Sequence, residues 1–362
     1  MNSGKLRKHS RRELLQMLAA GGAALVLNAC RVPPAPPPAG TTPAPTLLPP
    51  TPTTPAGWQP PTTIRITPND DFYTMKFHPS RPPAVDPDSY RLEISGEVDT
   101  PLSLSLADLK ALPAVTEMRT LECISNPVGG NLMGNATWTG VSMAALLAAA
   151  SVRPAGKHLK LESLDSYHTG IPIELALDEH ALLVYEMNGE PLPAKHGYPL
   201  RCLWPGRYGQ KQPKWIQRIT VQRQPHLGHF EAEGWSDEAI ILPNARIEQP
   251  PPRQVQPADF YVAGVAFYND SGLNAVDVSL DNGATWQPAE LLRGPSERTW
   301  TEWWLLAENA STGTMRVLAR VTDGSGRVQA LPRDSSSLLS GTFPNGTDEM
   351  HRVVVQVKNE GS

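Results

Sequence analysis

Cysteine is scarce in this chain, which has three, at positions 30, 123 and 202, among 362 residues. Three widely spaced cysteines exclude the paired framework of a disulfide-rich domain. Charge is also sparse: charged residues make up 19% of the chain, and the formal net charge is -4. A chain without a basic excess is not expected to bind nucleic acid generally. After the N-terminus, no apolar run is long enough to cross a bilayer.

Apolar residues are plentiful enough to build cores, and the length suits two domains. Hydrophobic residues make up 40% of the chain, and many of its 38 prolines precede residue 62. Composition and linker signals divide the chain into residues 1–30, 31–62, 63–248 and 249–362. The second of these segments is rich in Pro, Thr and Ala and nearly uncharged, so we expect an extended spacer.

The first thirty residues have the layout of an export signal. Basic residues gather between Lys5 and Arg12, and a short apolar run from Leu14 to Leu27 follows them. The pair in Ser10-Arg-Arg-Glu-Leu-Leu15 resembles a twin-arginine signal, which exports folded proteins. The segment Leu27-Asn-Ala-Cys30 resembles a lipoprotein cleavage site, which implies a lipid on Cys30 and a tether to the outer face of the cytoplasmic membrane. The alternative is a disordered leader without lipid.

Cys123 stands where a strand-like segment gives way to a loop rich in Asn, Pro and Gly. Such a thiol can point into a cavity that the loop shapes, and the glycines allow close approach of a bulky ligand. The alternative is a small buried hydrophobe, the usual role of a free cysteine and the one expected for Cys202. Cys123 as a hydrolytic nucleophile paired with His168 or His196 has little support, because neither histidine stands in a recognisable catalytic pattern with an acidic residue.

A second candidate site lies in the basic run that contains His196, Arg201, Arg207, Lys211 and Lys214. Such a run usually forms a solvated edge of the protein. The alternative is an anion pocket, since guanidinium and ammonium groups beside exposed backbone N–H groups bind phosphate well.

Several segments together resemble the sulfite oxidase family of molybdopterin-dependent oxidoreductases. The segment Thr120-Leu-Glu-Cys-Ile-Ser-Asn126 resembles the metal-binding loop of that family. The segment Val128-Gly-Gly-Asn-Leu-Met-Gly134 is similar to the corresponding segment of the family's bacterial exported branch. The order of Tyr185-Glu-Met-Asn-Gly189, His196-Gly-Tyr-Pro-Leu-Arg201 and Lys214-Trp215 also matches the family core. The resemblance covers about residues 63 to 335 and implies a molybdenum-molybdopterin cofactor. A thiolate is a soft donor suited to such a metal.

The resemblance assigns roles to individual residues. It implies that Cys123 is the catalytic residue and binds molybdenum. The other implied contacts to the cofactor are Asp70, Tyr73, Thr74, Ser163, His196, Arg201, Gln212, Pro213 and Lys214.

The expected fold class is α+β. Alternating segments such as Tyr90 to Val98 indicate half-buried strands, and Ser105 and Ser142 are expected to cap helices. Residues 63–248 should form a mixed α/β domain that binds the molybdopterin. Residues 249–362 contain strand-like runs and an Asp281-Asn-Gly283 turn, which predict a β-sandwich. The resemblance implies that this sandwich is immunoglobulin-like and supports a homodimer.

Two classes of function fit these features. One is an oxidoreductase that transfers an oxygen atom to or from a small substrate and, lacking a haem-binding segment, exchanges electrons with a separate partner. The other is a membrane-tethered binding lipoprotein that keeps the fold without catalysis. Sulfite is an unexpected substrate, because Met75, Pro127 and Trp235 stand where the resemblance places two arginines and a tyrosine. A pocket with fewer cations suits a neutral S-oxide or N-oxide better.

Overall fold

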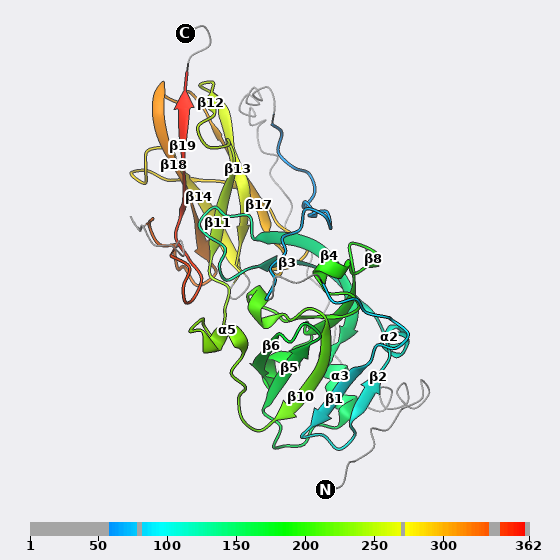
Figure 1. Ribbon diagram of the computed structural model, residues 1–362. Coiled ribbons are helices and arrows are strands. Elements are labelled where there is room, and N and C mark those ends of the chain that lie inside the picture. Colours follow the sequence, from blue (N-terminus) through cyan, green and yellow to red (C-terminus); the bar gives the residue numbers. More distant parts are fainter. Residues whose placement is uncertain (1–57, 78–81, 269–271, 333–340, 359–362) are drawn as a thin grey trace, which may run out of the picture.

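The computed structural model describes residues 58–77, 82–268, 272–332 and 341–358, and this part of the chain is rich in strands (Figure 1). The expected export signal, Cys30 and most of the expected spacer lie outside the described residues. Within the described ranges, no helix has both the length and the apolar character needed to span a membrane.

One five-stranded sheet forms the part of the molecule farthest from the C-terminus (Figure 1). Its strands run in the order β2 (Leu102–Leu104), β1 (Leu92–Gly96), β10 (Ile216–Gln222), β5 (His158–Ser163) and β6 (His168–Pro172). Strands β1 and β10 are parallel, and the other neighbours are antiparallel. Buried and half-buried side chains alternate along β1 and β5, as the sequence predicts for strands with one face on the core.

A second sheet carries the segment that contains Cys123. Its strands run in the order β3 (Val115–Glu122), β4 (Met133–Ser142), β7 (Leu182–Met187) and β8 (Glu190–Pro191), and β9 (Arg201–Leu203) also pairs with β7. The hairpin between β7 and β8 turns at Asn188 and Gly189, whose φ angles are 54° and 80°. Positive φ at both positions favours Asn-Gly, which explains this turn.

Helices are short in the described part of the chain. The segments are α2 (Leu106–Lys110), α3 (Met143–Ala150), α4 (Ile173–Ala176), α5 (His229–Ala232) and the 3₁₀ turns η1 (Ala194–His196) and η2 (Gly209–Lys211). Ser105 and Asp108 form the expected capping box of α2, and Ser142 caps α3. The protein is therefore richer in strands and poorer in helix than the expected mixture of the two.

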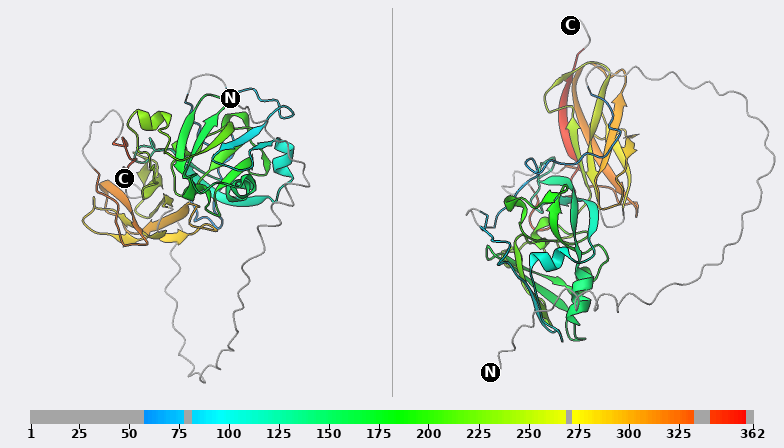
Figure 2. Two further views of the ribbon diagram at one scale, coloured as in Figure 1. Left: turned by 90° about the horizontal axis from the view of Figure 1, so that it is seen from below. Right: turned by 90° about the vertical axis from the view of Figure 1, so that its right-hand side faces the viewer.

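The C-terminal half contains two facing sheets that share one hydrophobic core (Figure 2). One sheet has the order β11 (Asn244–Gln249), β13 (Phe260–Phe267), β17 (Thr301–Ala307) and β16 (Glu290–Leu292). The other has the order β12 (Val255–Gln256), β19 (His351–Val357), β18 (Gly313–Asp323), β14 (Leu273–Ser279) and β15 (Gln287–Pro288). Val262, Val278 and Val355 are fully buried between them, because their strands alternate inward and outward side chains.

The two halves meet along the free edge of β3. The Thr120 N–H donates to the carbonyl of Arg298 at 2.8 Å, and its hydroxyl accepts from the N–H of Trp300 at 2.8 Å. Segments far apart in sequence thus support the strand that leads to Cys123.

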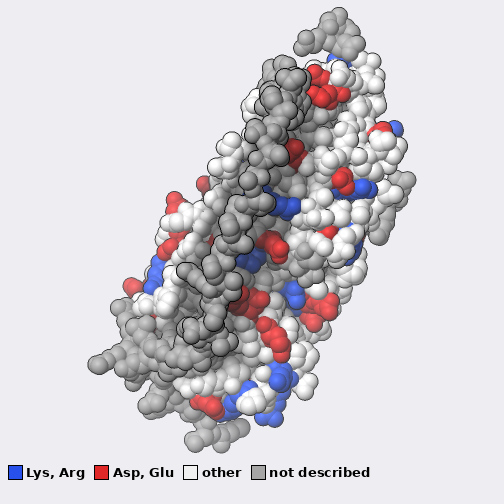
Figure 3. Space-filling model, turned by 180° about the vertical axis from the view of Figure 1, so that it is seen from behind, with Lys and Arg blue, Asp and Glu red and all other residues white. Residues whose placement is uncertain are grey.

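Strand β11 begins at Asn244, so the paired sheets start a few residues before the expected boundary at 248/249. On the face shown in Figure 3, basic and acidic side chains of the described residues are interspersed over short distances.

Candidate functional site

Cys123 directly follows the last residue of β3, at the junction that the sequence predicts. Its N–H donates to the carbonyl of Leu132 at 2.9 Å, which closes the loop between β3 and β4 at its base. The thiol sulfur lies 3.1 Å from the hydroxyl oxygen of Ser125, and the residue is 9% exposed. Burial raises the pKa of the Cys123 thiol, so the protein without a bound cation favours the protonated form.

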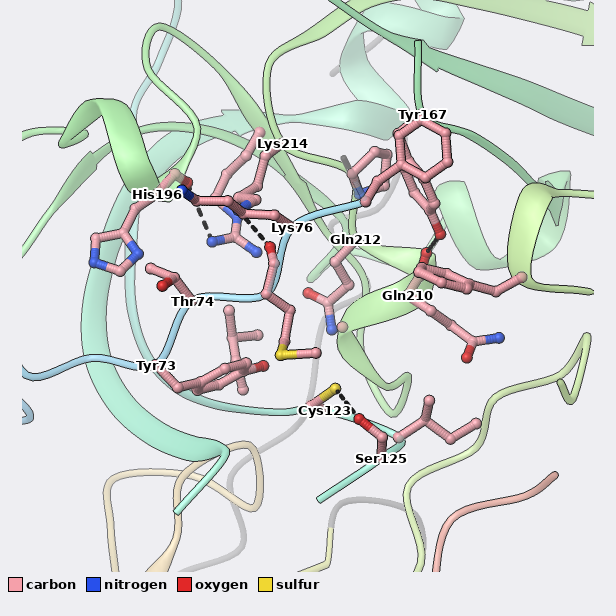
Figure 4. Close-up of a pocket in the computed structure, with 18 of the residues that line it drawn as sticks. Tyr73, Thr74, Lys76, Cys123, Ser125, Tyr167, His196, Gln210, Gln212 and Lys214 are labelled. Atoms are coloured by element: carbon pink, nitrogen blue, oxygen red, sulfur yellow. Dashed lines mark hydrogen bonds between the residues drawn. The ribbon is translucent and has the colours of Figure 1, made fainter. Parts of the chain in front are cut away.

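A cavity of about 260 Å³ opens beside this sulfur. Figure 4 shows the thiol of Cys123 and the hydroxyl of Tyr73 turned toward the same space, with His196 and Lys214 across it. The residues expected at the cofactor that line the cavity are Tyr73, Thr74, Cys123, His196, Arg201, Gln212, Pro213 and Lys214. The fold therefore brings together segments that lie more than a hundred residues apart in the sequence.

Asp70 and Ser163 are expected at the cofactor but are not among the lining residues. The side chain of Asp70 is fully exposed, and its carboxylate pairs with Lys195 at 3.0 Å. Ser163 is buried at the end of β5, and its hydroxyl has no hydrogen-bond partner. Contacts of these two residues with a cofactor remain predictions.

Two basic side chains in the cavity wall lack a carboxylate partner. Among the described residues, Arg201 and Lys214 form no ion pair with Asp or Glu, and the Nε of Arg201 is buried without a hydrogen-bond partner. The Arg201 guanidinium donates to the carbonyl of His196 at 3.2 Å and stacks over Trp138. Lys214 donates to the carbonyl of Met75 at 2.8 Å. An unpaired buried cation is costly, so this wall suits an anionic ligand.

Burial shifts the pKa of each basic group on this wall. It lowers the pKa of Arg201 to about 10 and that of His196 to about 4. Burial and then the neighbouring Arg201 lower the pKa of Lys214 to about 7, although Asp165 opposes the shift. An anion bound here would reverse these shifts, because it favours the charged form of each group.

The basic run that the sequence presents as one cluster is divided in the structure. Lys211 is 2% exposed and pairs with Glu231 and Asp237 at 2.7 Å each, so its charge is already compensated. Arg207 does not line the cavity. Of this run, His196, Arg201 and Lys214 line the cavity, where Lys76 adds a further basic side chain.

Several aromatic side chains also line the cavity. The ring of Tyr167 contacts Phe77 and Phe230, with ring centroids 5.7 Å and 5.6 Å apart, and Trp235 is a further lining residue. The Tyr167 hydroxyl donates to the carbonyl of Gln210 at 2.5 Å, which holds one ring in place (Figure 4). Sequence reasoning missed Tyr167, Gln210 and Phe230. Tyr167 and Phe230 reach the cavity through long-range packing, whereas Gln210 lies two residues before Gln212, which is expected there.

Comparison with known proteins identifies relatives of most of this chain. A family model described as the oxidoreductase molybdopterin binding domain matches residues 78–230. The sulfite oxidase of Gallus gallus is 32% identical over 315 residues, which cover 73% of this chain and 68% of that protein.

Two other matches extend this comparison. The mitochondrial sulfite oxidase of Rattus norvegicus is 31% identical, and the match covers 81% of this chain but 62% of the rat protein. The crystal structure of the sulfane dehydrogenase SoxCD from Paracoccus pantotrophus has a TM-score of 0.69 at 25% identity, with 80% of this chain and 83% of that chain covered.

Proposed function

This chain belongs to the sulfite oxidase family of molybdopterin-dependent oxidoreductases, and we propose that it transfers an oxygen atom to or from a small substrate. The observation that carries the proposal is the joint presence, in one cavity, of Cys123 and two basic side chains that form no ion pair within the described part of the chain, Arg201 and Lys214. The thiolate suits a soft metal, and the cations suit the phosphate of a pterin. The electrons would pass to or from a separate partner protein.

The unpartnered polar atoms of the cavity wall fit the cofactor of the family. The unpartnered Nε of Arg201 and the unpartnered amide oxygen of Gln212 are buried polar atoms that a polar ligand would satisfy. A Cβ on Gly197 would lie 3.1 Å from Cβ of both Arg201 and Lys214, so a glycine lets these two side chains lie close together. When bound, the molybdenum centre supplies oxygen-atom transfer and takes up or returns the electrons.

Each lining residue then has a role toward the cofactor or the substrate. Cys123 would bind the metal, and the imidazole of His196, whose Nε2–H donates to the carbonyl of Asn69 at 2.7 Å, would lie beside the pterin. The aromatic side chains that line the cavity would exclude water from the reacting atoms, which strengthens electrostatic interactions in the site.

We further propose that sulfite is a poor substrate. Met75 and Trp235 line the cavity at positions where the family resemblance implies an arginine and a tyrosine. His168 and Arg207, which could compensate for the missing charge, are not among the lining residues, and Lys76, which is, is exposed. A desolvated dianion needs cationic partners, whereas a neutral S-oxide or N-oxide does not.

Metal and pterin analysis of the purified protein tests the function first. We expect molybdenum and pterin in equal amounts, about one of each per chain. A folded protein that contains neither would favour a binding lipoprotein without catalysis. On loaded enzyme, sulfite oxidation should fall below a kcat/KM of about 10⁴ M⁻¹s⁻¹, while a dye-coupled assay detects reduction of sulfoxides or N-oxides. Sulfite turnover above that value would contradict the substrate proposal.

The setting of the enzyme is also proposed from the sequence. A lipid on Cys30 would hold the catalytic body at the outer face of the cytoplasmic membrane through the spacer. The paired C-terminal sheets would form an immunoglobulin-like sandwich that supports a homodimer, in line with their strand-rich shared core.

A further inference from the structure

The loop that follows Cys123 is held from outside by the C-terminal half of the chain. This loop, residues 124–132, joins β3 to β4 without a helix or strand of its own. Its internal bonds are few: Leu132 donates to the side-chain oxygen of Asn126 at 3.0 Å near the base, and Gly130 donates to the carbonyl of Pro127 at 2.8 Å in a turn at the tip. Contacts from β11 and β19 secure its tip.

His351, the first residue of β19, packs its ring directly against Gly129. A Cβ on Gly129 would lie 2.2 Å from Nε2 of His351, far inside van der Waals contact. The imidazole cannot simply swing away, because its Nδ1 accepts a hydrogen bond from the N–H of Ile247 at 2.9 Å. Burial lowers the pKa of His351 to about 4, which keeps Nδ1 available as an acceptor. Gly129 also has a φ of 71°, which favours glycine.

Arg246 on β11 holds the next residue of the loop. Its Nη1 donates to the carbonyl of Gly130 at 2.9 Å, and its other Nη atom pairs with Glu248. This ion pair fixes the guanidinium, whose side chain is 12% exposed. Asn244 on the same strand donates at 2.5 Å to the carboxylate of Glu122, the residue that precedes Cys123.

We propose that His351 and Arg246 are positioning residues, which set the place of the Cys123 sulfur by clamping the loop at Gly129 and Gly130. The C-terminal half is then part of the machinery that presents the metal ligand. The inference rests on the proposed role of Cys123, but the clamp itself is testable in protein without cofactor.

Thiol alkylation measures the clamp directly. In the full-length apoprotein, the rate of maleimide labelling is followed separately at Cys123 and Cys202 by peptide mass spectrometry. Cys202 is fully buried in the core, so its labelling reports global unfolding. We expect Gly129→Ala and His351→Ala each to speed labelling of Cys123 about tenfold and to leave Cys202 unchanged.

A matched control separates the clamp from glycine strain. Gly189 also has a positive φ, 80°, but a Cβ there would meet nothing within 4 Å. Gly189→Ala should therefore alter neither labelling rate. The double variant Gly129→Ala/His351→Ala should label Cys123 no faster than His351→Ala alone, because the methyl group enters the space that the ring leaves.

Two results would overturn the proposal: Cys123 labelling within about twofold of wild type in both single variants, or equal acceleration at Cys123 and Cys202. If Gly129→Ala yields no folded protein, His351→Ala and Arg246→Met carry the same test with the same outcomes. In loaded enzyme, the variants should also shift the thiolate-to-molybdenum absorption. A wild type without molybdenum would refute the proposed function, yet the labelling result would still decide the clamp.

Discussion

Lys214 makes anion binding in the cavity dependent on pH in a defined direction. Its pKa of about 7 results from burial and from the positive charge of Arg201. A bound oxyanion favours the ammonium form, so binding above that pKa requires uptake of a proton. Sulfate is a suitable probe, because its own charge does not change in this range.

The size of the effect follows from the pKa. About three-quarters of Lys214 is protonated near pH 6.5 and about 3% near pH 8.5, so sulfate affinity should fall about 25-fold between them. Isothermal titration calorimetry on apoprotein, in buffers of different ionisation enthalpy, should also show uptake of nearly one proton at the higher pH.

Lys214→Arg is the matched control, because arginine stays charged throughout this range. We expect it to bind sulfate with a nearly flat pH dependence, while Lys214→Met binds weakly at both values. The same 25-fold fall in Lys214→Arg would refute the reasoning, since another group would then be the one that titrates. The folding free energy gives an independent check. In the unfolded chain the pKa of Lys214 returns to its usual, higher value, so above about pH 7 the unfolded chain binds more protons than the folded one. This residue therefore makes the apoprotein more stable as pH rises above about 7.

Three further perturbations have definite expected results. Cys123→Ser should leave the chain folded but abolish turnover and the thiolate-to-molybdenum absorption, and full turnover in this variant would exclude Cys123 as the ligand. Lys211→Ala should lower the free energy of unfolding in urea by about 3–5 kcal/mol, because it strands the buried carboxylate of Glu231, whereas Lys110→Ala at an exposed pair should cost less than about 1 kcal/mol. Cys30→Ala should move the protein from the membrane fraction to the soluble one, and a wild type that is already soluble would contradict lipidation.

Several features of the fold could be predicted from the sequence because they depend on near neighbours. The Ser105–Asp108 capping box joins residues three apart, and the Asn188–Gly189 turn needs two adjacent positive φ angles. The strand Phe260–Phe267 can be recognised in the sequence, since its apolar content and its flanking turns mark it. The low helix content could not be predicted in this way, because short helices and connecting loops share the same local composition.

The sequence by itself determined that Cys123 lies where a strand gives way to a loop and that a basic run supplies Arg201 and Lys214. Only the tertiary structure decided which members of that run face the cavity. Lys211 is two residues from Pro213 in the wall, yet it turns to Glu231, because the segment that carries this carboxylate packs over it. A buried charged side chain points toward its ion-pair partner, and the spacing of residues in the sequence does not say where that partner lies in space. The contact of Gly129 with His351, more than two hundred residues away, has the same origin: it exists because two separate sheets meet.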